Sequence, residues 1–261
     1  MAFFRRHRRK QLRQKAFPEP WRALVEEHVA YYRLLSSEEQ RDLLGHMQVF
    51  LAEKHFEGCG GLELTDAMRL TVAAYACLLM LNRDLEYFPR LSSILLYPSA
   101  YVVPDEQEDE AGVVTESDSV HLGESWSIGA VVLSWDDVRR DAGHLDGHNV
   151  VLHEFAHQID RADGASDGWP DHIEHNLQDR WLEIMGREFE ELKTAVHRGR
   201  PASIDPYGAT NPAEFFAVLT EAFFTSPVSL HRNHPDLYNL FREFYEQDPL
   251  DRLRQAGGGL K

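Results

Sequence analysis

A short helix with two unlike faces limits the fold of this chain more than any other feature of its sequence. Residues 149–161 follow a helical period in which the apolar side chains form one stripe, and Asn149 suits the N-cap position. His153 and His157 fall on the opposite side, one turn apart, and Glu154 lies next to them. The fold must therefore bury one face of this helix in a core and leave the other face beside a cleft.

The residue types on the polar face indicate a metal site. Residues 153–157 read H-E-x-x-H, a pattern in which two imidazoles bind one zinc ion and the glutamate accepts a proton from the water held there. The bare pattern also arises by chance, and the alternative is a surface helix with a charged glutamate between two ordinary histidines. The amphipathic setting favours a catalytic zinc site, which needs a third protein ligand and one open position for water.

Several residues are candidates for the third ligand. Asn211 is a predicted N-cap that places Glu214 in the first turn of a helix, although Glu214 could instead close a capping box onto Asn211. Glu221 lies seven residues further on, on roughly the same face, and is the second candidate. His172 and His175 form a weaker pair, because their position suggests a solvated helix start.

Three sequence segments carry a resemblance to a known family. Residues 153–160, 205–208 and 211–217 read HEFAHQID, DPYG and NPAEFFA. Together they resemble the Mlc titration factor A family of bacterial zinc metallopeptidases, over about residues 18–249. The resemblance implies a zincin-type catalytic core, similar to that of the lethal-factor toxin protease. It also implies aminopeptidase-like cleavage of short peptides and binding of the glucose-responsive repressor Mlc.

The same resemblance implies a role for each of five residues. His153, His157 and Glu214 would bind Zn²⁺, and Glu154 would be the catalytic base. Tyr207 would be the active-site tyrosine, donating a hydrogen bond to the developing oxyanion. Without the resemblance, an aromatic side chain packed after an Asp-Pro turn is the favoured interpretation of Tyr207. The long separation between His157 and Glu214 disagrees with a thermolysin-type assignment, in which the ligand helix follows sooner.

Two further features lie near this site. Asp160 falls on the histidine side of the helix, where it either orients an imidazole or is simply a polar residue near the helix end. Ala130–Leu133 is predicted as a strand upstream of the motif helix, and its backbone could pair with an extended peptide. The alternative for this segment is an ordinary internal strand.

The remaining pattern predicts a helix-rich α+β fold with a small β-sheet and an N-terminal helical layer. Besides the motif helix, helices are predicted at residues 21–35, 37–56, 65–82, 172–198, 212–224 and 235–246, and strands at 94–103, 120–122 and 130–135. Ser36 and Glu39 form a possible capping box. We expect one zincin-like metallopeptidase domain over residues 16–250, with the helical layer at 16–90 and the catalytic part at 91–250.

Charge is distributed unevenly along the chain, whose net charge is −16. The first 15 residues hold seven Lys or Arg and no acid, whereas residues 104–119 hold seven Asp or Glu and no base. We expect both segments to be solvated and poorly ordered, with a basic flexible tail at 1–15 and a second tail at 251–261. The acidic body disfavours general nucleic-acid binding.

Composition also limits where the protein acts. Two cysteines exclude a disulfide scaffold, and the longest apolar run, residues 70–81, is too short to cross a bilayer. Because no segment has the form of a secretory signal, we expect a cytoplasmic protein without a transmembrane segment. The leading hypothesis is a zinc peptidase that acts on peptide substrates. The alternative is a regulatory protein-binding module that sequesters a repressor of the Mlc type.

Overall fold

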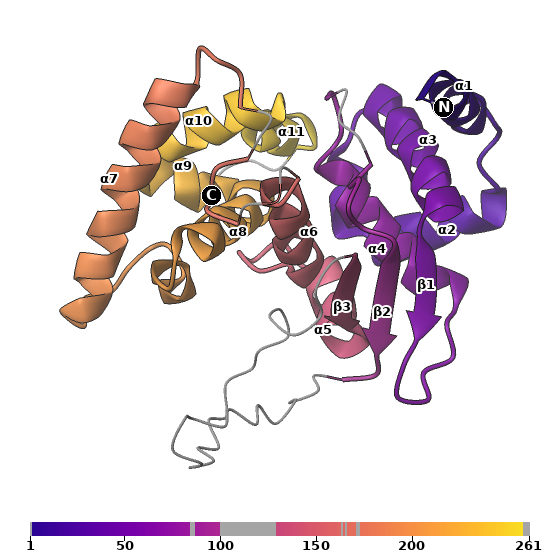
Figure 1. The fold of residues 1–261 in the computed structure, drawn as a ribbon, viewed down its shortest axis with the longest axis horizontal. Coiled ribbons are helices and arrows are strands. Elements are labelled where there is room, and N and C mark those ends of the chain that lie inside the picture. The colour runs from indigo at the N-terminus through magenta and orange to yellow at the C-terminus, as the bar shows by residue number, and fades with distance from the viewer. Residues whose placement is uncertain are drawn as a thin grey trace.

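Helices make up most of the fold, and a small sheet lies among them (Figure 1). The computed structural model describes residues 2–83, 87–99, 129–162, 164, 166–170 and 173–257. The α-helices are α1 (Ala2–Arg13), α2 (Glu19–His28), α3 (Ser37–Glu53), α4 (Asp66–Leu78), α5 (Trp135–Ala142), α6 (Val150–Asp160), α7 (Gln178–His197), α8 (Pro212–Thr225), α9 (Pro227–Asn233), α10 (Pro235–Tyr245) and α11 (Pro249–Gln255). The short 3-10 helices are η1 (Ala30–Leu34) and η2 (Pro206–Ala209), and the strands are β1 (His55–Gly58), β2 (Ser93–Tyr97) and β3 (Ala130–Ser134). The predicted helix-rich α+β class is confirmed.

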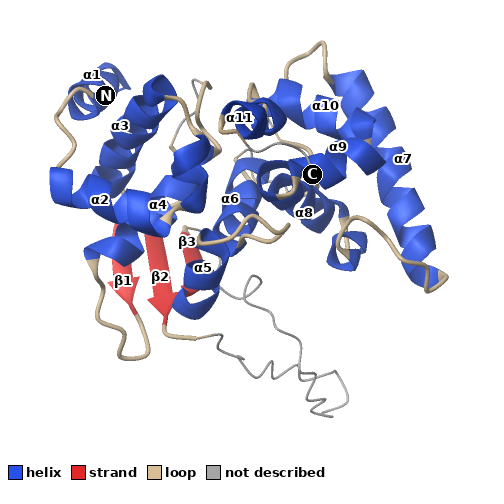
Figure 2. Ribbon diagram, turned by 180° about the vertical axis from the view of Figure 1, so that it is seen from behind, coloured by secondary structure: helices blue, strands red, loops and turns tan. Residues whose placement is uncertain are grey.

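The three described strands form one parallel sheet in the order β1-β2-β3 (Figure 2). Parallel neighbours need a crossover connection rather than a hairpin, and α4 lies in the crossover between β1 and β2. The predicted strand at 94–103 ends earlier, at Tyr97, and residues 100–103 lie outside the described residues. The strand predicted at 120–122 lies outside them as well. β3 stands at one end of the strand order and leads directly into α5.

The N-terminal helical layer is present, but its helices end at other positions than predicted. The capping box at the start of α3 is confirmed, since Ser36 accepts the Glu39 N–H at 3.2 Å and Glu39 accepts the Ser36 N–H at 2.8 Å. The predicted helix at 37–56 is too long at its C-terminal end, because α3 ends at Glu53 and β1 begins at His55. The predicted helix at 21–35 is divided at Val29, whose extended backbone separates α2 from η1.

The expectation of a flexible basic tail at 1–15 is wrong, because residues 2–13 form α1 and this helix packs on α3. The Arg9 guanidinium donates to both carboxylate oxygens of Glu53, at 2.9 and 2.7 Å, and lies 4.8 Å from the Tyr87 ring centroid. Gly45 of α3 allows α1 to approach α3 closely, since a Cβ atom at this position would meet the Arg13 carbonyl oxygen at 3.2 Å. Arg9 and Arg13 of α1 therefore have acidic partners on α3, Glu53 and Asp42.

The expectation of a tail at 251–261 is also wrong for its first half, which belongs to α11. Arg252 in this helix is buried and donates to Glu39 in the N-terminal layer, to the Tyr31 hydroxyl at 3.1 Å and to Gln247 at 2.8 Å. Two guanidinium nitrogens of Arg252, Nε and Nη2, donate to the same Glu39 oxygen, Oε1, at 3.0 and 2.5 Å. The C-terminal helix is thus held to the N-terminal layer by a partly buried ion pair.

Helix α6 lies between the N-terminal part with the sheet and the C-terminal helices α7 to α11 (Figure 1). Its apolar stripe is buried as predicted, and Phe155 packs edge-on against Phe88 and beside Phe50. On its other side α6 packs against α8. The fold thus holds the motif helix by its apolar stripe and places α8 across its histidine face.

The C-terminal helices pack through aromatic side chains around Trp181, which contacts Phe216, Phe241 and Phe244. The long helix α7 begins at Gln178, later than the predicted start at 172, and the short helices α9 and α11 were not predicted. Within the described part of the chain, no helix is both long and apolar enough to cross a membrane.

Candidate metal centre

Helix α6 presents the two histidines of the motif to one place. Asn149 caps the helix, because its side-chain oxygen accepts the Leu152 N–H at 3.0 Å. His153 and His157 follow one turn apart, and their ring centroids are 4.9 Å from each other. Both imidazoles turn toward Glu214 of α8. The half-buried Glu154 follows His153 directly in the chain and interacts electrostatically with both histidines.

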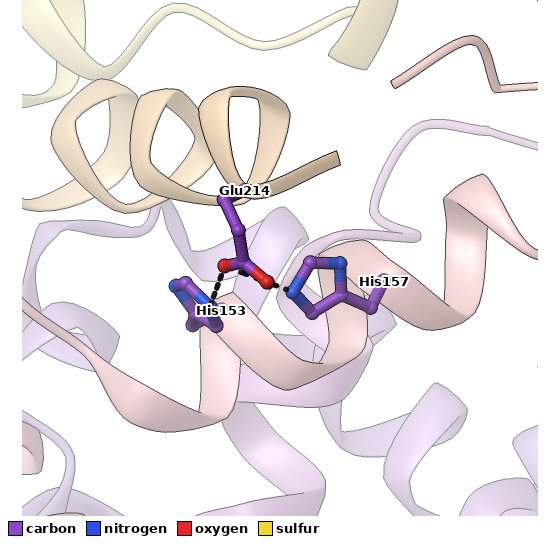
Figure 3. A group of neighbouring side chains, drawn as sticks. All are labelled: His153, His157 and Glu214. Atoms are coloured by element: carbon purple, nitrogen blue, oxygen red, sulfur yellow. Dashed lines mark hydrogen bonds and ion pairs between the residues drawn. The ribbon is translucent and has the colours of Figure 1, made fainter. Parts of the chain in front are cut away.

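Helix α8 brings Glu214 against both imidazoles (Figure 3). Asn211 caps this helix by accepting the Glu214 N–H at 2.9 Å, while the Glu214 carboxylate extends toward α6. Its Oε2 atom lies 3.0 Å from His153 Nε2 and 3.4 Å from His157 Nε2. The Glu214 side chain therefore faces the histidine pair, and the alternative in which it closes a capping box onto Asn211 is not observed.

The geometry of these three residues fits a zinc ion. Their ligand atoms all lie within 4.8 Å of one another. Around a tetrahedral zinc with bonds of ~2.0–2.1 Å, ligand atoms stand about 3.3 Å apart, close to the two distances from Glu214 Oε2. Two imidazoles and one carboxylate are also the donor set of catalytic zinc sites, in which a fourth position stays open. His153, His157 and Glu214 could thus hold one divalent cation.

The charges at this centre also favour a cation. Burial lowers the pKa of His153, but its hydrogen bonds to Glu214 and Glu221 outweigh burial and raise the pKa to about 10. Burial raises the pKa of Glu214, but hydrogen bonds from His153 and His157 outweigh it and lower the pKa to about 2. For Glu154 burial dominates and raises the pKa above its usual range. A carboxylate of raised pKa is suited to accept a proton and pass it on.

Glu221, the second candidate ligand, lies on the far side of His153 from Glu214. Its Oε1 atom is 2.7 Å from His153 Nδ1, whereas Glu214 approaches the Nε2 atom of the same ring. Its other oxygen, Oε2, accepts the Asn149 N–H at 2.6 Å. Glu221 is buried and does not belong to the group of side chains that could share one ion within the described residues.

Tyr207 lies close to His153. Its ring centroid is 6.0 Å from that of His153, and 53% of its surface is exposed. The tyrosine belongs to η2, whose start is fixed by Asp205 accepting the Tyr207 N–H at 2.8 Å. Tyr207 is thus a largely exposed aromatic side chain near His153, and the interpretation of it as a packed aromatic does not fit this exposure.

The remaining polar candidates lie elsewhere. Asp160 is fully buried, and its Oδ2 atom accepts the Gly168 N–H at 3.1 Å, so this carboxylate holds the loop after α6. No hydrogen bond joins Asp160 to an imidazole within the described residues. His175 is exposed and contacts Gln178 at 3.2 Å, away from the centre, whereas His172 lies outside the described residues.

Sequence reasoning missed the contact between Glu221 and the Nδ1 atom of His153. The only sequence signal for this contact was the seven-residue spacing between Glu214 and Glu221, which placed both on one helix face. It also missed Gly168, whose left-handed backbone (φ +72) brings the loop against Pro212, two residues before Glu214. Both contacts join segments that are far apart in the sequence, so no local sequence pattern predicts them.

Comparison with known proteins shows which family this chain belongs to. Residues 3–246 match the family described as glucose-regulated metallo-peptidase M90. An uncharacterised protein of Synechocystis is 42% identical over 245 residues, covering 93% of this chain and 89% of its own length. The Mlc titration factor A of Klebsiella pneumoniae is 37% identical over 238 residues, covering 85% of this chain and 84% of its own. The Mlc titration factor A of Escherichia coli is 35% identical over 249 residues, covering 91% and 89%. The chain therefore belongs to the glucose-regulated metallo-peptidase family M90.

Proposed function

We propose that this protein is a zinc-dependent peptidase that hydrolyses peptide bonds, with aminopeptidase-like action on short peptides. The observation that carries the proposal is the convergence of His153, His157 and Glu214 from two helices, with Glu154 close enough to interact electrostatically with all three. Structural zinc sites are usually closed by four protein ligands, whereas three ligands and an adjacent carboxylate are typical of catalytic sites.

Each residue then has a chemical task. A bound Zn²⁺ ion would supply Lewis-acid chemistry, polarising the scissile carbonyl and lowering the pKa of the attacking water. Glu154 accepts the proton of that water and passes it to the leaving amine, in line with its raised pKa. Tyr207 donates a hydrogen bond to the carbonyl oxygen as negative charge develops there. The end strand β3 offers its backbone to an extended substrate.

The first test separates metal binding from hydrolysis. Glu154→Gln should keep zinc, measured by elemental analysis, but abolish chelator-sensitive cleavage of a chromogenic aminoacyl or short peptide substrate. Glu190→Gln, an exposed change on α7, is the matched control and should leave both unchanged. Retained turnover in Glu154→Gln would remove Glu154 as the base.

A second test concerns the metal itself. Glu214→Ala should lose zinc, because two imidazoles alone provide an incomplete site. Wild-type protein that stays free of metal under zinc-replete conditions would contradict the proposed function as a whole.

A regulatory role is the second candidate, favoured by the name of two relatives, Mlc titration factor A. We propose that this chain also binds a transcriptional repressor of the Mlc type, which would place it in the cytoplasm. Binding of purified Mlc can be measured with the wild type and with Glu154→Gln. Binding that survives this change supports an interaction separate from hydrolysis, whereas no binding to either protein contradicts it.

A further inference from the structure

Glu221 is a buried carboxylate behind the metal centre, and only 7% of its surface is exposed. Both of its oxygens are used. Oε1 lies 2.7 Å from Nδ1 of His153, and Oε2 accepts the backbone N–H of Asn149 at 2.6 Å. Because Asn149 is the N-cap of α6, one side chain contacts both the beginning of the motif helix and its first histidine.

The contact with His153 determines which ring nitrogen can bind a metal. An ionised carboxylate only accepts hydrogen bonds, so the Nδ1 atom must carry the hydrogen. In the neutral imidazole the other nitrogen, Nε2, then holds the lone pair. Nε2 is the atom that lies 3.0 Å from the Glu214 carboxylate. Both nitrogens of this ring therefore face a carboxylate. Once a metal ion replaces the hydrogen on Nε2, the hydrogen bond to Glu221 would keep the remaining hydrogen on Nδ1.

The second histidine has no such support among the described residues. The Nδ1 atom of His157 is buried and makes no hydrogen bond there. His153 is therefore the imidazole whose ring is held from behind. Helix α8 supplies both the carboxylate in front of this ring, Glu214, and the one behind it, Glu221.

We propose that Glu221 is a positioning residue of the metal centre, which holds His153 in the Nδ1–H tautomer without binding the metal itself. The inference rests on the proposed zinc site and adds Glu221 as a residue on which the zinc affinity of that site depends. A carboxylate behind a ligating histidine fixes the ring and raises its basicity, and losing such a group typically weakens metal binding about 10–100-fold.

The test compares Zn²⁺ affinity, measured by competition with a chromogenic chelator, in the wild type and in Glu221→Gln. A glutamine has one acceptor oxygen, whereas His153 and Asn149 each need one, so one of the two contacts must be lost. We expect zinc affinity to fall about 10–100-fold. The matched control is Glu188→Gln, since Glu188 is also buried and lies 2.7 Å from a histidine nitrogen, Nδ1 of His234, outside this centre. Glu188→Gln should bind zinc as tightly as the wild type.

A spectroscopic measurement separates positioning from a merely structural role. In the zinc-loaded wild type, nitrogen-15 NMR of the histidine rings should show the proton of His153 on Nδ1. A proton on Nε2 would overturn the inference, even if Glu221→Gln fails to fold. Zinc affinity of Glu221→Gln within threefold of the wild type would overturn it as well.

Two further outcomes distinguish a wrong role for Glu221 from a wrong proposed function. If Glu221→Gln loses zinc completely while Glu214→Gln keeps it, Glu221 is a ligand and the inference is wrong. If the wild type binds no zinc, the proposed function fails instead.

Discussion

Replacing Gly168 with alanine should weaken the metal centre, although this residue is not one of its proposed ligands. Gly168 links three helices. Its N–H donates to Asp160 at the end of α6, and its carbonyl accepts the Trp181 indole N–H from α7 at 3.2 Å. Its left-handed backbone (φ +72) lies against the first residue of α8, Pro212.

The size of the effect follows from the space at this position. A Cβ atom on Gly168 would lie 2.4 Å from the Pro212 carbonyl oxygen, and contacts under 3.0 Å are essentially never seen for real Cβ atoms. The loop and α8 must therefore separate by at least about 0.6 Å, whereas a functional site tolerates about 0.5 Å. The left-handed backbone costs an alanine about 1–2 kcal/mol, and overpacking adds about 1–3 kcal/mol. We expect a total loss of about 2–5 kcal/mol of stability and at least tenfold weaker zinc binding.

Gly199→Ala separates the backbone effect from the steric one. Gly199 also has a left-handed backbone (φ +60), but a Cβ atom there would meet nothing within 4 Å. This variant should lose only about 1–2 kcal/mol and keep its zinc affinity. Urea unfolding of the metal-free proteins and chelator competition with Zn²⁺ measure the two quantities. Equal zinc affinity in Gly168→Ala and Gly199→Ala would refute the reasoning.

Three further changes test other parts of the molecule. Tyr207→Phe should lower kcat about 10²–10³-fold with little change in KM, and an unchanged kcat in steady-state assays would exclude the oxyanion contact. Burial, and to a lesser degree Arg13, lowers the pKa of His46 to about 3. The unfolded chain therefore binds a proton below pH ~6.5 that the folded protein does not, and stability falls as the pH drops toward 3. Urea unfolding at pH 7.5 and 5.0 measures how much the free energy of unfolding decreases between the two pH values. This decrease should be about 2 kcal/mol smaller in His46→Gln than in the wild type, and an equal decrease would contradict the role of His46. Arg252→Met should cost about 2–4 kcal/mol, because it leaves Glu39 without its buried partner, whereas the exposed change Arg254→Met should cost under about 0.5 kcal/mol.

The parts of the fold that were predicted from sequence depend on local patterns. The apolar stripe of α6 and its Asn149 cap lie within 12 residues, and both are found as expected. The cap at Asn211 and the first turn of α8 are equally local. Helical periodicity sets which side chains share a face, so it could place His153 and His157 together.

The parts that were missed depend on contacts between distant segments. The residues of α1 carry many positive charges, and such a segment alone is typical of solvated chain. Its partner Glu53 lies 44 positions away from Arg9. Likewise β1 is only four residues long and follows an amphipathic helix without a break, and its pairing with β2 joins segments separated by α4. A short strand of this kind is stabilised by its neighbour and has no signal of its own.

The two candidate carboxylates on α8 show why a shared helix face does not settle a shared role. Seven residues bring Glu214 and Glu221 back to nearly the same face, but they also separate their backbones by about 10 Å along the helix axis. Two carboxylates so far apart can reach the same imidazole only from different directions. In the structure Glu214 meets the Nε2 edge of His153 and Glu221 meets the Nδ1 edge. Because an imidazole binds a metal through one nitrogen and can donate through the other, these directions assign the two glutamates to different tasks.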